Sequence, residues 1–128
     1  MIGEPTYWIV AAVIVLVAVC VALYFTVFRR KKVYEEFYED PNCLKRTCTL
    51  VKCGSEKEYL KDGEERVFYP TGELNKTITW VKGKKNGPFT IFYKSGEKYI
   101  TGSYDNDSLV GDYYVFDKDS KVIKSFKY

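Results

Sequence analysis

The residues that could carry chemistry in this chain are few, and their types exclude most catalytic designs. The 128 residues include no histidine. This removes the commonest general base, the commonest metal ligand and every Ser–His or Cys–His nucleophile pair. The carboxylates and tyrosines form no paired-acid or nucleophile motif. We therefore expect a protein that is not an enzyme and that uses no cofactor.

Three cysteines, Cys43, Cys48 and Cys53, follow one another at intervals of five residues. Zinc sites use Cys-x2–4-Cys pairs and a fourth ligand, so this spacing does not predict a metal. A disulfide between two of them would leave the third thiol unpaired. The simplest interpretation is reduced cysteines in a strand or loop. Cys20 lies in an apolar segment and is most simply a small apolar residue.

An uncharged run extends from Tyr7 to Phe28, and it positions the rest of the chain. At about 1.5 Å of rise per residue it makes roughly 33 Å of helix, enough to cross a hydrocarbon core of about 30 Å. Aromatic residues stand near both ends, with Tyr7 and Trp8 at the start, as expected at membrane interfaces. The run predicts a single transmembrane helix after a short tail, residues 1–6. A cleaved secretory signal is the alternative, but the run is too long and the tail has no basic residue.

The chain has 20 Lys and Arg against 17 Asp and Glu, and the excess lies in one place. Arg29, Arg30, Lys31 and Lys32 follow the apolar run at once, and the charges beyond them balance. By the positive-inside rule this cluster predicts a C-terminal domain in the cytoplasm and an N-terminus outside or in the lumen. Balanced charge in the domain argues against nucleic-acid binding.

The segment after the basic cluster has a helical pattern, because Tyr34, Phe37 and Tyr38 fall at positions i, i+3 and i+4. We therefore expect residues 29–42 to form a basic juxtamembrane stalk helix that continues the membrane helix and stops at the next proline. Residues 43–58 are then a connector or a partial first repeat.

The second half of the chain repeats itself with a period of 24 residues. Phe68, Phe92 and Phe116 align at this shift. The same shift aligns further glycine and aromatic positions, among them Gly63, Gly87 and Gly111, Gly72 and Gly96, and Trp80, Tyr104 and Tyr128. A fixed period in this size range marks stacked supersecondary units.

Each unit has the pattern of a β-hairpin. Residues 89–93 alternate as a half-buried strand does, and Ser95-Gly96 is a turn signal before a second strand through Tyr99 and Tyr104. A single hairpin cannot bury its apolar face. We therefore expect residues 59–128 to form one antiparallel β-meander of stacked hairpins, a small all-β domain behind the transmembrane helix. The glycines expected at its turns are Gly63, Gly72, Gly83, Gly87, Gly96 and Gly111.

This pattern resembles the MORN-repeat family, in the variant found in bacterial antitoxin-like proteins. The resemblance rests on the turns at residues 93–97 (Tyr-Lys-Ser-Gly-Glu) and 82–87 (Lys-Gly-Lys-Lys-Asn-Gly), each beside aromatic-rich strands, and it covers residues 59–128. The chain departs from the family at residues 105–110, without the Gly-Lys-Lys turn, and at residues 117–120, without the turn glycine. Both departures suggest a degenerate or capping unit. The resemblance implies a β-meander that binds proteins or membranes and has no catalytic residue.

The first class of function that fits is a membrane-anchored scaffold whose β domain docks a protein partner or assembly. A link between a membrane and a protein shell, such as a minor structural protein of a membrane-containing large virus, is one example. The ring positions expected to face a partner are Tyr69, Trp80, Tyr93, Tyr99, Tyr104 and Tyr113. A second copy of the chain is a further candidate partner, because an open sheet leaves an edge strand for pairing.

Two other classes stay open. One is an antitoxin-like or immunity-type regulator that masks a partner enzyme. The other is a phosphoinositide or membrane-surface module, in which residues 29–32 act together with Lys82, Lys84 and Lys85. Glycosylation sequons at Asn75 and Asn106 would matter only if the domain faced the lumen.

Overall fold

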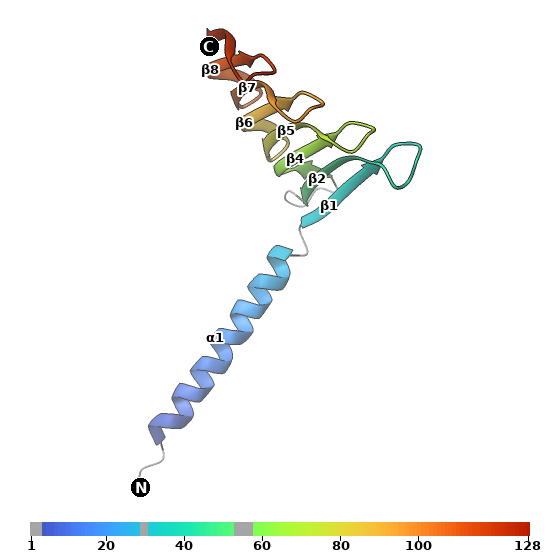
Figure 1. Ribbon diagram of the computed structural model, residues 1–128. Helices are drawn as coiled ribbons and strands as arrows, with labels where there is room; N and C mark the ends of the chain where they lie inside the picture. The colour runs from blue at the N-terminus through green and yellow to red at the C-terminus, as the bar shows by residue number, and fades with distance from the viewer. Residues whose placement is uncertain (1–3, 29–30, 53–57) are drawn as a thin grey trace. The chain divides into compact units, whose positions relative to one another are not determined.

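The computed structural model describes residues 4–28, 31–52 and 58–128, and it divides into two parts, residues 1–31 and 32–128. The first part contains one helix, α1 (Glu4–Phe28), and the second contains an open antiparallel sheet (Figure 1). The predicted fold, a single apolar helix followed by a small all-β domain, is confirmed.

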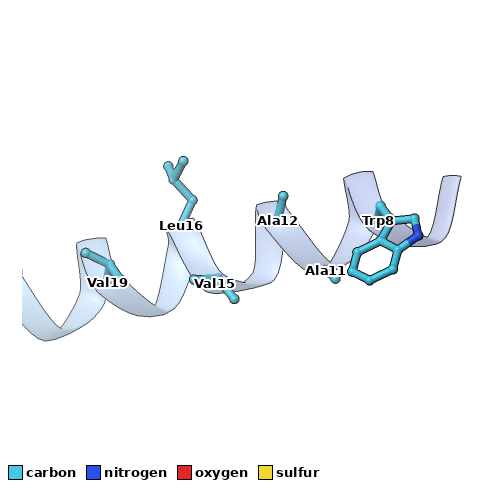
Figure 2. Close-up of a pocket in the computed structure, with 6 residues that line it drawn as sticks. All are labelled: Trp8, Ala11, Ala12, Val15, Leu16 and Val19. Atoms are coloured by element: carbon cyan, nitrogen blue, oxygen red, sulfur yellow. The ribbon is translucent and has the colours of Figure 1, made fainter. Parts of the chain in front are cut away.

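Helix α1 has 25 residues, and its segment Thr6–Phe25 is long and apolar enough to cross a membrane. Apolar side chains are exposed around it, so it has no single apolar stripe of the kind that packs onto a water-soluble core. Figure 2 shows one side of the helix, where a shallow depression is lined by Trp8, Ala11, Ala12, Val15, Leu16 and Val19. The predicted membrane segment is therefore present as a suitable helix.

The second part is a nine-stranded sheet. Its strands are β1 (Lys31–Phe37), β2 (Leu44–Lys52), β3 (Tyr59–Lys61), β4 (Gly63–Phe68), β5 (Leu74–Val81), β6 (Lys84–Phe92), β7 (Lys98–Asp105), β8 (Ser108–Phe116) and β9 (Val122–Lys127). The order across the sheet is β1-β2-β4-β5-β6-β7-β8-β9, and the short β3 pairs with the end of β2 beside β4. Chain order and spatial order therefore coincide, as expected of a meander, and Figure 1 shows successive hairpins stacked side by side.

The prediction of a stalk helix at residues 29–42 is wrong for the part of that range that is described. Residues 31–37 form strand β1, and the Tyr38 amide donates to the carbonyl of Cys43 at 2.9 Å to close a turn into β2. The spacing of Tyr34 and Tyr38 also fits one face of a strand, and aromatic and β-branched residues favour a strand where a neighbouring edge supplies backbone partners. Arg29 and Arg30 lie outside the described residues.

Residues 43–58 were expected to be a connector or a partial first repeat; residues 44–52 form the full strand β2, so the connector is wrong for this part and the repeat alternative is confirmed. The meander therefore begins at β1 and contains four hairpin units, β1–β2, β4–β5, β6–β7 and β8–β9, in the described part of the chain. The pair Phe37-Tyr38 corresponds to Phe68-Tyr69. It escapes a search at the 24-residue period because the first unit is longer than the others.

The turns inside the later units share one geometry. In the β4–β5 turn the Tyr69 amide donates to the Glu73 carbonyl at 2.8 Å, and the Gly72 amide donates to the Tyr69 carbonyl at 2.9 Å. The β6–β7 and β8–β9 turns repeat both bonds. The left-handed position is held by Gly72 (φ 97°), Gly96 (φ 101°) and, in the last unit, by Ser120 (φ 61°). The missing turn glycine thus leaves the turn intact but places a side chain in a costly conformation.

The turns between units are also conserved in shape. Lys82 and Gly83 have φ values of 47° and 84°, and Asn106 and Asp107 have 46° and 72°. Positive φ at both central residues is the two-residue hairpin turn that matches the twist of antiparallel strands. Asn and Asp tolerate this conformation better than most residues. Residues 105–110 therefore keep the turn without the Gly-Lys-Lys sequence.

Candidate interaction surface

The sheet has two chemically different faces, because neighbouring residues along a strand point to opposite sides. One face, here called the threonine face, carries a line of register partners across seven strands: Thr47, Arg66, Thr77, Thr90, Thr101, Tyr114 and Ser125. The other face carries a row of rings and is called the aromatic face: Trp80, Phe89, Tyr104, Tyr113, Phe126 and Tyr128.

The aromatic face is built from two equivalent positions, one on each strand of a hairpin, whose side chains are neighbours in each unit from β4 to β9. Trp80 donates from Nε1 to Oε2 of Glu65 at 2.9 Å. One period later, the rings of Phe89 and Tyr104 lie 4.9 Å apart between centroids. One period further, Tyr113 and Tyr128 lie 6.1 Å apart. The repeat therefore places the same pair of positions side by side each time, and only their chemistry changes.

The pair in the β4–β5 unit belongs to a buried ionic cluster. Glu65 is 3% exposed, and its Oε1 lies 2.7 Å from Lys61 Nζ and 3.4 Å from Arg46 Nε. Arg46 also lies 3.7 Å from Glu36 of the first unit. A carboxylate this deeply buried requires such partners, since an unpaired buried charge is strongly destabilising. This cluster joins the first two units and stabilises the end of the sheet that follows the helix in sequence.

Lysines alternate with the rings on the aromatic face near the Glu65 cluster. Lys61 Nζ lies 4.6 Å from the Trp80 ring centroid, and Lys85 Nζ lies 5.1 Å from that of Tyr104 and 6.0 Å from that of Trp80. Cations in these positions are attracted to the ring faces. In the described part of the chain Lys85 has no carboxylate partner, so its charge stays available to a ligand.

Exposure of the aromatic face rises toward β9. Phe89 is only 6% exposed and Tyr113 is half-buried, whereas Phe126 is 49% and Tyr128 61% exposed. Burial raises the pKa of the Tyr113 hydroxyl above its ordinary value. At 5.9 Å from the Tyr113 ring, Phe126 continues the row to the last strand. The β8–β9 end of this face thus presents rings that the sheet does not cover.

The six predicted partner-facing residues fall into two groups. Trp80, Tyr104 and Tyr113 lie together on the aromatic face. Tyr69 and Tyr93 lie near the turns instead, where their hydroxyls donate to the carbonyls of Phe92 at 3.0 Å and Phe116 at 2.8 Å. Tyr99 stacks on Tyr93 with centroids 4.7 Å apart.

Tyr38 follows the same rule as Tyr69 and Tyr93, since its hydroxyl donates to the carbonyl of Phe68 at 2.9 Å. Each of these tyrosines thus bonds to the next unit along the chain. Asp117 takes the equivalent position in the last unit and accepts instead from the amides of Asp119 and Lys121, both at 2.9 Å. This tyrosine series holds consecutive units together, and in the β8–β9 unit Asp117 takes its place.

The residues assigned to the membrane boundary are described in part. Tyr7 and Trp8 are exposed on α1, at 83% and 76%. Lys31 and Lys32 belong to β1, and Lys32 Nζ lies 4.7 Å from the ring centroid of Tyr59. Gly63, at the start of β4, also has positive φ. Gly87 and Gly111 have positive φ as well, but the prediction that they lie at turns is wrong, because they lie inside β6 and β8.

Sequence reasoning missed Glu65, because charged residues are expected on the surface. The signal was nevertheless present, since Glu65 stands one period before Phe89 and two before Tyr113. Cys48 is buried beside this cluster, and burial raises the pKa of its thiol. Cys43 and Cys48 are both free thiols, and Cys53 lies outside the described residues. No group of potential ligands placed to hold a metal ion occurs among the described residues.

Comparisons with models of protein families, with curated proteins and with solved structures found no match to this chain.

Proposed function

We propose that this protein is a non-enzymatic scaffold, which α1 anchors in a membrane and whose aromatic face docks a protein partner. The observation that carries the proposal is the row of rings that becomes progressively more exposed from Phe89 to Tyr128. Tyr, Trp and Phe are the residue types enriched in the buried centres of protein interfaces. Lys85 beside the rings adds charge that can select an acidic partner surface.

The anchor is supported by the length and apolar character of α1, and the orientation is proposed from the basic residues that follow it. In this arrangement the sheet faces the cytoplasm. The resemblance to MORN repeats is consistent with a binding role, and the β4–β9 units repeat one hairpin geometry at the 24-residue period.

Crosslinking and affinity capture of the full chain from native membranes tests this function. We expect one stoichiometric protein partner or a protein lattice, with crosslinks on the aromatic face. A variant with Tyr104→Ala should lose the partner, whereas Tyr114→Ala, on the threonine face of the neighbouring strand, should keep it.

Other outcomes of the capture have definite meanings. A single enzyme that the chain inhibits would replace the scaffold with a regulator. Capture of lipid alone, with no partner protein at any salt concentration, would contradict docking and favour a membrane-surface module.

A further inference from the structure

The sheet ends in two edge strands whose outer sides have no backbone partner among the described residues. On β9, Val122, Ile123 and Phe126 are 52%, 56% and 49% exposed. On β1, Val33 is 70% and Phe37 is 45% exposed. Unpaired edges of this length and apolar character are templates for pairing with another chain.

We propose that copies of this chain associate head to tail, with β9 of one copy pairing with β1 of a second copy. Strands alternate in direction across the whole sheet, from β1 at one edge to β9 at the other. A second copy in the same orientation therefore presents β1 antiparallel to β9, as β6 is presented to β5 and β8 to β7. The junction would continue the meander, and it depends neither on the anchor nor on the proposed partner.

The internal repeat predicts the register of this junction. At the two equivalent junctions inside the chain, Lys76 lies opposite Ile91 and Ile100 lies opposite Val115. Lys124 is the next member of the series of Lys76 and Ile100. On β1, Glu36 corresponds to Ile91 and Val115, because each directly precedes the phenylalanine that leads into the turn. Lys124 should therefore lie opposite Glu36 of the second copy.

The same register also sets compatible side chains opposite one another at the neighbouring positions of the junction. Ser125 falls opposite Glu35, and Phe126 falls opposite Tyr34 on the aromatic face. Tyr34 is 44% exposed and would extend the row formed by Tyr113 and Phe126 into the next copy. Both the ring pair and the lysine–glutamate pair are favourable cross-strand combinations.

The direction of the backbone groups supports this register independently. Gly111 and Tyr128 exchange both amide–carbonyl bonds, at 3.1 and 2.9 Å, so by alternation the backbone groups of Ser125 point away from β8. On the other edge the Tyr38 amide donates inward to Cys43, so alternation turns the groups of Glu35 outward. Ser125 and Glu35, which the repeat places opposite each other, therefore both have outward-facing backbone groups.

Charge selects this junction over the pairing of two β9 edges. β9 and the turn before it carry Lys121, Lys124 and Lys127 but no acidic residue after Asp119, so two β9 strands would bring like charges together. β1 offers Glu35 and Glu36. Glu36 already lies 2.7 Å from Lys45, and that lysine holds the pKa of the Glu36 carboxyl below its ordinary value. Asp117 lacks the tyrosine hydroxyl that joins internal units, so this junction should be weaker and reversible.

Zero-length carbodiimide crosslinking of the full chain in detergent micelles tests the junction. The predicted product is an amide between Lys124 and Glu36. These residues are seven strand spacings apart in one chain, about 34 Å at about 4.8 Å per strand. A Lys124–Glu36 link can therefore form only between copies.

Two variants and their controls make the test decisive. Lys124→Glu places a carboxylate opposite Glu36 and should weaken self-association about tenfold in sedimentation velocity, whereas Lys118→Glu, the same charge change in the exposed turn, should not. Ser125→Pro removes an outward amide and should abolish association, whereas Ser125→Thr should leave it unchanged. Circular dichroism checks that each variant stays folded.

Lys124–Glu36 links between two copies of the chain that disappear in Lys124→Glu, together with oligomers lost in Ser125→Pro, would support the proposal. A chain that stays monomeric at all concentrations would overturn it. Oligomers that survive both variants would also overturn it, because association would then run through another surface such as α1.

Discussion

At the scale of single residues, one hydroxyl per unit joins neighbouring hairpins. Tyr69 and Tyr93 were expected to face a partner, but their hydroxyls are used inside the sheet, on carbonyls of the following unit. The sequence could not reveal this, because the reach of a hydroxyl across two strands depends on register and twist. Their rings remain half-buried near the turns, away from the pairs that build the aromatic face.

Replacing Tyr93 by Phe should therefore destabilise the sheet. It removes one hydrogen bond and leaves the Phe116 carbonyl without that donor, at a cost of about 1 kcal/mol in the free energy of unfolding. Urea unfolding of the full chain in micelles measures the loss. Tyr99→Phe is the control, since the Tyr99 hydroxyl makes no hydrogen bond in the described part of the chain. Equal effects of the two variants would contradict the structural role of Tyr93.

The last turn offers a stabilising substitution. Ser120 has φ 61° where the equivalent residues are glycines. Ser120→Gly should raise the free energy of unfolding by about 1 kcal/mol, because the left-handed conformation costs a side chain roughly that much. The reverse change, Gly96→Ser, should destabilise by a similar amount. No increase in the urea midpoint for Ser120→Gly would show that the serine is not strained.

Hydrogen bonds in two of the turns lower the carboxyl pKa values of Glu73 and Glu97. The Ser95 hydroxyl and the backbone amide of Glu97 itself hold the pKa of the Glu97 carboxyl below its ordinary value of 4.5. Thr71 and the Glu73 amide do the same for Glu73. Since the folded pKa is the lower one, the stabilising contribution is present above pH 4.5 and is lost as the pH falls through the folded pKa.

Ser95→Ala should raise the pKa of Glu97 toward 4.5 and leave Glu73 unchanged. Carboxyl chemical shifts followed by NMR across acidic pH measure both groups in one experiment, so Glu73 serves as the internal control. An unchanged Glu97 titration would show that the hydroxyl does not set its acidity.

At the scale of elements, the fold was largely predictable because its signals are local. Alternating strands, Gly-containing turns and the 24-residue period define hairpins one after another, and a meander pairs strands that are neighbours in sequence. The error at β1 has the same origin. Tyr34, Phe37 and Tyr38 satisfy a helical spacing, and only the edge of β2, distant from this local pattern, decides for a strand.

The close packing of the aromatic face can be tested at Gly102. A Cβ at this position would lie 2.7 Å from Phe89 Cε1 and 3.2 Å from Tyr113 Cδ2. Gly102→Ala should therefore destabilise the sheet by about 1–3 kcal/mol in urea unfolding. Ser103→Ala, next along the strand, should have little effect. In a Phe89→Leu background the cost of Gly102→Ala should shrink, and an unchanged cost would locate the strain elsewhere.

At the scale of the whole molecule, an apolar helix is joined to a sheet that has a single layer. In the described part of the chain only Cys48, Glu65 and Phe89 are buried, and each keeps a few per cent of its surface exposed. The sheet thus relies on backbone pairing, stacked rings and the Glu65 ion cluster rather than on a second layer. Composition and periodicity predicted three of the rings that form the aromatic face, Trp80, Tyr104 and Tyr113. They did not reveal that the same face contains a buried carboxylate.

The most direct test of docking on the aromatic face is site-specific photocrosslinking of the full chain in native membranes. The photoreactive amino acid p-benzoylphenylalanine would replace Tyr104 on the aromatic face or, as the matched control, Tyr114 on the threonine face. We predict that the position 104 variant captures a distinct partner protein and that the position 114 variant does not. Capture from position 114 alone, equal capture from both, or none from either would contradict the account.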